Sequence, residues 1–272
     1  MSEIVTFPTG MQVEMKSRSV SELRATLKGF KNSLVASSTS ALEAASVRLV
    51  SAGNYPEDRI TKDNDQVNWA KATSEDRLWG LVATRILSFS AGAHYKMEVN
   101  CGNCSKNFQR EVDLRRIEDG GEIVCWDFEN EEHQVAFKKG IPFEGKLGDL
   151  TIKWRMLYGE DEALIENIAK GNPDVNTDEL SLNIKIVEVE GKHRNDVEKW
   201  IKTLGDERIE LQDMISEASA GVDLVIDVKC PWCDCEQESS VPFDLEFWIP
   251  VVAQERTRRR RRREKALKKT IQ

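Results

Sequence analysis

The feature that most constrains the fold of this chain is a pair of Cys-x-x-Cys motifs, Cys101 to Cys104 and Cys230 to Cys233. Each motif lies between two segments in which apolar residues occupy every second position. This period is typical of half-buried strands, so each motif is predicted to lie in the turn of a β-hairpin. Two such turns that face each other supply four thiolates in the arrangement of a structural zinc site. The alternating segments are 95–101 and 108–114 around the first motif, and 224–230 and 241–243 around the second.

The sequence therefore predicts one structural zinc ion bound by Cys101, Cys104, Cys230 and Cys233. The 125 residues between the motifs (105–229) exceed the usual gap of a zinc ribbon. Paired cysteines in a reducing compartment nevertheless bind metal more often than each other. Unligated thiols are the main alternative, and an iron–sulfur cluster would use the same four thiolates. Thiol–disulfide exchange is disfavoured because neither pair follows a strand and opens a helix.

Two further cysteines are expected to stay outside the site. Cys235 offers a third thiol beside the second motif, but the x-x spacing favours Cys230 and Cys233 as ligands. Cys125 lies in an apolar run, which is typical of a buried, reduced cysteine.

The predicted fold is α+β, with two pseudo-repeated halves that meet at a zinc-ribbon-like site of four cysteines. In each half a strand leads into a helix with an acidic first turn, and further helices lead to a strand and a Cys-x-x-Cys hairpin. This order indicates an internal duplication. We predict an N-terminal half with the first zinc knuckle (1–120), a C-terminal half with the second (121–254) and a basic, Arg-rich tail (255–272).

The hydrophobic periodicity predicts most elements of both halves. In the first half, Ser19 to Glu22 has capping-box spacing, and a strong helix begins near Thr73. In the second half, a helix begins at Gly159 with Leu164, Ile165 and Ile168 on its buried face. The other expectations are a strand at 11–18, a weak helix at 37–52, an exposed loop at 55–68, strands at 122–128, 133–137 and 150–156, a strand or helix at 181–190, and helices over 197–204 and 209–215.

The net charge of −8 is unevenly distributed. Residues 255–272 contain ten Lys and Arg against two Glu, a charge of +8, so the remaining 254 residues carry −16. Blocks of like charge are typically interaction segments. We expect the six consecutive arginines to contact an acidic partner protein, because the tail lacks aromatic residues for base stacking; nucleic acid is the alternative. These arginines are Arg258, Arg259, Arg260, Arg261, Arg262 and Arg263.

Little in the sequence indicates catalysis. The chain contains no phosphate-binding loop, nucleophile elbow or His-Glu-x-x-His motif. His94, His133 and His193 are scattered, and a closed four-cysteine site leaves no position for a small-molecule substrate. A long apolar run and a signal peptide are also missing, so we expect no membrane association and a cytoplasmic protein.

Short motifs recur along the chain at 77–78, 85–87, Tyr95, 101–104, 155–162, 221–223, 230–233, 241–243 and 247–250. Together they resemble the baseplate-hub assembly proteins of T-even-like contractile-tailed bacteriophages. The resemblance covers about residues 75 to 250, with a weaker similarity at 7–10. A long polar insert at 55–68 and the Arg-rich tail depart from the family pattern.

The resemblance implies a non-enzymatic protein that acts in building the baseplate hub or tail-initiation complex, as a hub subunit or an assembly chaperone. Its partners would be phage tail, hub or tape-measure proteins, in the host cytoplasm or in the virion tail baseplate. The competing hypothesis is a zinc-ribbon nucleic-acid-binding or transcription accessory protein that uses the tail. Phe247 and Trp248 are expected either to form an apolar docking patch or to close the core behind the second hairpin.

Overall fold

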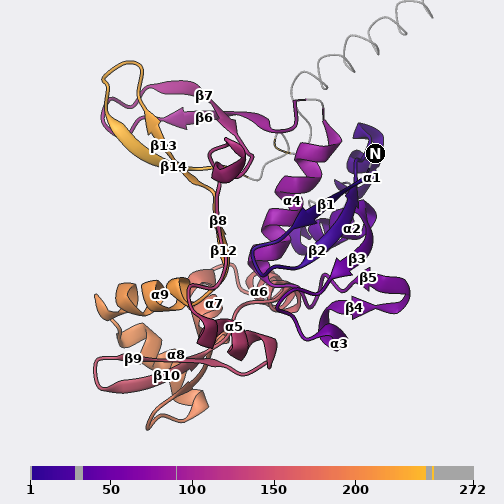
Figure 1. Cartoon of the computed structure of the whole chain (residues 1–272). Coiled ribbons are helices and arrows are strands. Elements are labelled where there is room, and N and C mark those ends of the chain that lie inside the picture. Colours follow the sequence, from indigo (N-terminus) through magenta and orange to yellow (C-terminus); the bar gives the residue numbers. More distant parts are fainter. Residues whose placement is uncertain (1, 28–32, 90, 243–246, 248–272) are drawn as a thin grey trace, which may run out of the picture.

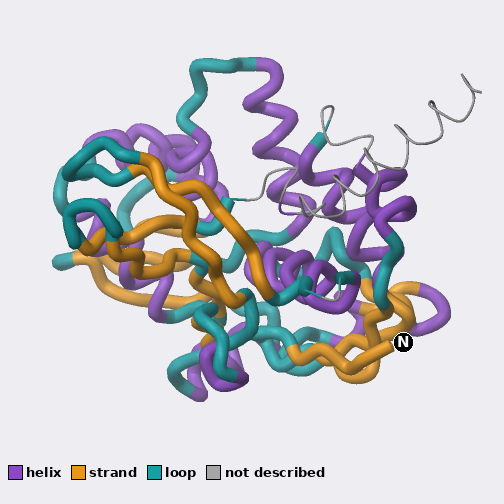
Figure 2. The backbone as a smooth tube through the Cα atoms, turned by 90° about the horizontal axis from the view of Figure 1, so that it is seen from above, coloured by secondary structure: helices purple, strands orange, loops and turns teal. Residues whose placement is uncertain are grey.

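The computed structural model describes residues 2–27, 33–89, 91–242 and 247, and it shows helices combined with several small antiparallel sheets (Figure 1). Three parts can be distinguished: an N-terminal lobe (2–89), a C-terminal lobe (131–217), and a hairpin lobe in which residues 94–113 lie beside residues 225–240. Figure 2 shows the strands in separate groups between the helices. The predicted mixture of helices and sheets is confirmed, whereas the internal duplication stays a prediction.

The N-terminal lobe packs a three-stranded antiparallel sheet, in the order β1-β2-β3, against α2 and α4. Alternation along β2 places Val13 and Met15 in the core. Helix α4 begins as predicted, because Oγ1 of its N-cap Thr73 accepts a hydrogen bond from the backbone of Asp76 at 3.2 Å. The elements are β1 (Ser2–Thr6), β2 (Gln12–Lys16), α1 (Val20–Leu27), α2 (Leu34–Ala45), β3 (Ser46–Ser51), α3 (Glu57–Ile60), β4 (Thr61–Lys62), the 3-10 helix η1 (Asp63–Asp65), β5 (Gln66–Val67) and α4 (Ser74–Ser88).

The hairpin lobe contains both predicted Cys-x-x-Cys hairpins. Alternating residues of each hairpin point inward and are buried, among them Tyr95, Met97 and Val99 of the first, and Ile226 and Val228 of the second. The period-two pattern therefore identified β6, β7 and β13 and their buried faces correctly. The strand expected at 241–243 is wrong: the second hairpin returns through Glu236–Ser240, whose polar residues show no apolar alternation. The strands are β6 (His94–Asn100) paired with β7 (Asn107–Asp113), and β13 (Val225–Lys229) paired with β14 (Glu236–Ser240).

The C-terminal lobe surrounds a second three-stranded sheet, in the order β11-β10-β9, with helices. A short ribbon of β8 and β12 connects it to the hairpin lobe (Figure 1). The elements from the first hairpin onward are the 3-10 helix η2 (Ile117–Asp119), β8 (Val124–Trp126), α5 (Glu131–Lys138), β9 (Phe143–Leu147), β10 (Leu150–Trp154), α6 (Gly159–Gly171), α7 (Thr177–Lys185), β11 (Ile186–Val189), α8 (Arg194–Thr203), α9 (Glu207–Glu217) and β12 (Gly221–Asp223).

Helix α4 links all three lobes. At its first turn, the backbone of Ser74 donates to the carbonyl of Leu157 at 2.9 Å. Near its end, the buried Arg85 donates to the carbonyls of Phe247 and, at 3.2 Å, of His94. Phe247 is fully buried and its ring lies 5.5 Å from that of Tyr95, so it belongs to the core; Trp248 lies outside the described residues.

Two expectations for the N-terminal lobe are wrong. The weak helix expected over 37–52 ends at Ala45, and β3 follows, because Val13 and Leu49 pair across the sheet. The segment 55–68 is not an exposed loop: Tyr55 and Ile60 are buried in the core, with short helices and strands around them. Few but large apolar side chains fix this polar segment to the lobe.

Three expectations for the C-terminal lobe also need correction. Residues 133–137 form part of α5, capped by Asn130, rather than a strand. On α6, Leu164 and Ile168 are exposed rather than buried. The segment 181–190 divides into the end of α7 and strand β11, so helix and strand are each correct for part of it. Among the described residues, no helix is both long enough and apolar enough to span a membrane.

Candidate metal centre

The two Cys-x-x-Cys turns have the same backbone hydrogen bonds. In the first, the N–H of Cys101 donates to the carbonyl of Lys106 at 3.0 Å, and that of Ser105 donates to the carbonyl of Cys101 at 2.8 Å. In the second, the N–H of Cys230 donates to the carbonyl of Cys235 at 2.9 Å, and that of Asp234 donates to the carbonyl of Cys230 at 3.0 Å. Each turn is thereby closed in a conformation that directs two sulfurs to one side.

The residue after each motif also has the same left-handed conformation. Ser105 has φ 58° and Asp234 has φ 57°. Short polar side chains tolerate this region better than most L-residues. The strand registers correspond too, because Asn100 pairs with Asn107, and Lys229 with Glu236. The two knuckles are therefore local structural equivalents.

The structure brings the four predicted cysteines together. Their sulfurs all lie within 4.8 Å of one another, with 3.6 Å between Cys101 and Cys233 and 3.7 Å between Cys104 and Cys230. Four sulfurs placed about 2.3 Å from a tetrahedral metal would be separated by about 3.8 Å. The donor set is thus the right size to hold one metal ion, and each hairpin contributes two ligand atoms.

Side chains from each hairpin brace the knuckle of the other. Gln237 of β14 accepts from the N–H of Gly102 at 2.9 Å and donates to the carbonyl of Asn100 at 3.0 Å. Asn103 of the first knuckle donates to Sγ of Cys233 at 3.5 Å. Such outer contacts orient the ligands of a metal site. The sequence did not predict the roles of Gln237 and Asn103. The only available signal was position: Asn103 lies within the first motif, and Gln237 follows the second.

Hydrogen bonds favour the thiolate form of two of the cysteines. The backbone N–H groups of Cys104 and Asn103 lower the pKa of Cys101. The Asn103 side chain and the N–H of Cys235 lower the pKa of Cys233 to about 6. Thiolates, rather than thiols, bind metals. With four sulfurs so close, a cation is also needed to neutralise the charge that accumulates as they ionise.

The remaining cysteines and the histidines do not join this cluster. Sγ of Cys235 donates to the carbonyl of Glu236 at 3.5 Å, and Cys125 is half-buried near the ribbon, where burial raises its pKa to about 12. In the part of the chain that the structure describes, the four-sulfur group is the one cluster of potential metal ligands, and it includes no histidine. The predicted partner-binding arginines, Arg258 to Arg263, lie outside the described residues.

An exposed tryptophan occupies the tip of the second knuckle. Trp232 is 61% exposed, and Nζ of Lys106 lies 5.1 Å from the centre of its ring. Trp232 takes the position that Asn103 has in the first knuckle, so the two equivalent turns present different side chains.

Comparison with models of protein families, with curated proteins and with solved structures finds no match to this chain.

Proposed function

We propose that this protein is a non-enzymatic assembly protein of a contractile-tailed bacteriophage, acting at the baseplate hub or the tail-initiation complex as a scaffold, chaperone or hub subunit. One structural zinc ion, bound by Cys101, Cys104, Cys230 and Cys233, holds the hairpin lobe together. The observation that carries the structural part is the four-sulfur cluster formed from two distant hairpins. The phage assignment rests on the sequence motifs that resemble the hub assembly proteins.

Four thiolates complete the tetrahedral coordination of zinc, so no position would remain for a substrate or a reactive water. The role of the ion is then to join residues 94–113 to residues 225–240. The equivalence of the two knuckles is also what an internal duplication would leave behind, although each half has acquired different side chains around its cysteines.

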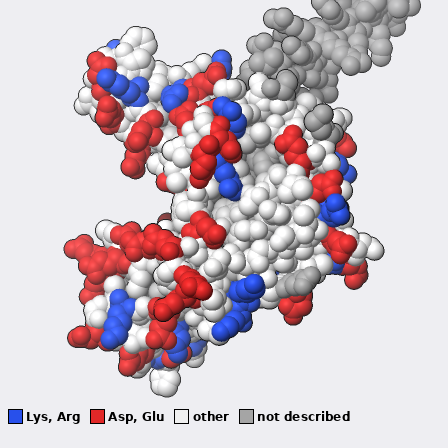
Figure 3. All heavy atoms as spheres, viewed as in Figure 1, with Lys and Arg blue, Asp and Glu red and all other residues white. Residues whose placement is uncertain are grey.

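A protein partner suits the surface of the hairpin lobe better than nucleic acid does. A nucleic-acid-binding ribbon should present a basic face. Here acidic residues such as Glu98, Glu111, Asp227 and Glu238 are interspersed with the lysines on the exposed faces of the strands. Figure 3 also shows acidic side chains gathered over the lobe that faces the hairpins, in the region of α9. Trp232 supplies an exposed aromatic anchor of the kind that dominates protein interfaces.

The test is to isolate the tagged full-length protein from phage-infected cells, identify its partners by mass spectrometry, and measure its metal content. We expect one zinc per chain and co-purification of tail or hub proteins that persists at high salt. Iron with visible absorption would contradict zinc. Recovery of nucleic acid alone, lost at high salt or on deletion of residues 256–272, would instead support the zinc-ribbon accessory protein.

A further inference from the structure

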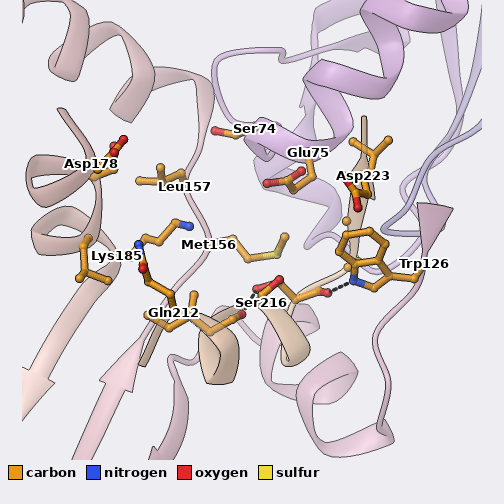
Figure 4. A pocket seen from close by; sticks show the side chains of 17 residues that line it. Ser74, Glu75, Trp126, Met156, Leu157, Asp178, Lys185, Gln212, Ser216 and Asp223 are labelled. Carbon is orange, nitrogen blue, oxygen red and sulfur yellow. Dashed lines mark hydrogen bonds between the residues drawn. The ribbon is translucent and has the colours of Figure 1, made fainter. Parts of the chain in front are cut away.

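A cavity of about 530 Å³ lies where the N-terminal and C-terminal lobes meet. Its walls come from the start of α4, from α7 and α9, and from the ribbon of β8 and β12 (Figure 4). Met156, Leu182 and Ile215 provide apolar lining, and Trp126 is held beside them by a 2.7 Å hydrogen bond from its Nε1 to the carbonyl of Ser219. This size and mixed lining are typical of small-molecule sites.

Two opposite charges face the interior without meeting. Glu75 of α4 and Lys185 of α7 are half-buried, and their charged ends point toward the middle of the cavity (Figure 4). Within the described part of the chain, no ion pair joins them, and the Lys185 ammonium has no hydrogen-bond acceptor. The Glu75 carboxylate accepts a hydrogen bond from the backbone of Val222. Burial raises the pKa of Glu75 and lowers the pKa of Lys185, and the attraction between the two charges offsets each shift only in part.

A third polar group in the same wall is unsatisfied. Oγ of Ser74 is buried and has no hydrogen-bond partner among the described residues. Buried polar groups in folded proteins are nearly always paired. This oxygen is closed off from molecules the size of water, so the separated acid and amine, rather than the hydroxyl, are the groups that a bound molecule would pair.

Acidic residues in the cavity lining favour ligands that carry a positive charge. Asp178 in the first turn of α7 and Asp223 at the end of β12 line opposite sides of the cavity, and both are exposed (Figure 4). Together with Glu75 they give the cavity three carboxylates against the single ammonium of Lys185. Such an excess attracts ligands with net positive charge and disfavours acidic ones.

We propose that this cavity binds a small zwitterion of the basic amino-acid class. The ligand carboxylate pairs with Lys185, its α-ammonium pairs with Glu75, and its cationic side chain extends toward Asp223. The site is separate from the sulfur cluster and does not depend on the proposed role in phage assembly.

The first experiment is calorimetric titration of the zinc-loaded full-length protein with L-arginine and L-lysine, with L-norleucine and L-glutamate as probes that lack the cationic side chain. We expect arginine or lysine to bind, norleucine to bind about tenfold more weakly, and glutamate to give no heat. No binding of either basic amino acid at millimolar concentration would overturn the proposal, as would equal binding of all four.

Variants then assign the two ends of the ligand. Glu75→Gln and Lys185→Gln should each weaken arginine binding about tenfold or more. Glu118→Gln and Lys199→Gln, at exposed positions that do not line the cavity, are the matched controls and should bind normally. Retained zinc and an unchanged circular dichroism spectrum would show that each variant is folded.

A decarboxylated probe separates a specific contact from a general loss of structure. Agmatine lacks the carboxylate of arginine, so it should bind the wild-type protein more weakly, and Lys185→Gln should leave its affinity unchanged or raise it, because the substitution removes a like charge. If Lys185→Gln weakens agmatine and arginine equally, Lys185 does not pair with the carboxylate and the assignment fails.

Discussion

Arg77 and Glu162 form an ion pair between α4 and α6, with 2.8 Å from Nε to Oε2, across a separation of 85 positions in the sequence. The Arg77 side chain is only 2% exposed, and it also donates to the carbonyl of Trp69 at 2.9 Å and to Oγ of Ser38 at 3.1 Å. One guanidinium therefore satisfies acceptors from three segments of the chain. It ties the N-terminal lobe to the C-terminal lobe.

Replacing Arg77 should be costly. Arg77→Met leaves a carboxylate, a carbonyl and a hydroxyl without their donor, and we expect the free energy of unfolding to fall by about 3–5 kcal/mol. Urea denaturation measures the change. The control is Arg48→Met. The Arg48 side chain is 64% exposed in its ion pair with Glu14, so its loss should change the free energy of unfolding little. Equal effects of the two substitutions would contradict the structural role of Arg77.

Gly159 is predicted to tolerate no side chain. A Cβ at this position would lie 2.6 Å from the carbonyl oxygen of Trp69 and 2.8 Å from Nη1 of Arg77. Gly159→Ala should therefore destabilise the protein by about 1–3 kcal/mol through overpacking. At Gly171, the other end of α6, an added Cβ would have no atom within 4 Å, so Gly171→Ala should be neutral or slightly stabilising. Thermal unfolding of the two variants measures the difference. A lower melting temperature for Gly171→Ala than for Gly159→Ala would contradict the prediction.

The metal site predicts a division among the cysteines. Cys104→Ser and Cys233→Ser should lose zinc and unfold at much lower denaturant concentration, because each removes one of four ligands. Cys125→Ser and Cys235→Ser should keep one zinc per chain, since neither sulfur belongs to the cluster. Elemental analysis after gel filtration measures the metal. Zinc that survives loss of Cys104 but not of Cys235 would show that the ligand set is wrong.

Asp76 should impose a pH dependence on stability. Burial raises its pKa from 3.8 to about 6, although Thr9 and Tyr55 donate hydrogen bonds to the carboxylate. Between these values the native state binds the proton more tightly than the unfolded chain does. The contribution of Asp76 is then fully present below pH 3.8 and is lost as the pH rises through about 6. Over this pH range the contribution of Asp76 to the free energy of unfolding changes by about 3 kcal/mol in total.

Comparison with Asp76→Asn isolates this effect from the pH dependence of metal binding. The difference in unfolding free energy between variant and wild type should shift in favour of the variant as the pH is raised from about 5 to about 7.5, because only the wild type loses its contribution from position 76. Urea denaturation across this range provides the measurement. A difference that does not vary with pH would mean that Asp76 titrates alike in both states.

Trp232 should matter for partner binding and not for folding. Because its ring is 61% exposed at the knuckle tip, Trp232→Ala should retain zinc and stability but lose co-purification of the hub partner. Ile117→Ala provides an exposed apolar control, with a side chain that is 57% exposed. Undiminished partner recovery from Trp232→Ala would exclude the knuckle tip as an anchor.

The two knuckles and three of their four strands could be predicted from the sequence because apolar alternation and cysteine spacing are local patterns. The fourth strand, Glu236–Ser240, was missed because it has no apolar alternation. Prediction failed where burial is decided by distant segments. Residues 133–137 are a different case: the alternation of Val135 and Phe137 suggested a strand, but the local N-cap Asn130 and the acidic first turn indicate the helix that forms. Leu164 and Ile168 lie at helical spacing and nevertheless face solvent, because α6 packs through other residues. The cavity could not be predicted from the sequence for the same reason, because the residues that line it come from separate lobes.

The pairing of knuckles from opposite ends of the chain has a consequence for biosynthesis. Cys101 and Cys104 leave the ribosome more than a hundred residues before Cys230, so the first hairpin must wait, with its apolar face and two reactive sulfurs uncovered, until the second is made. Cellular zinc supply would then act as a late checkpoint on maturation, and chains that stop early would be recognised as incomplete by proteases.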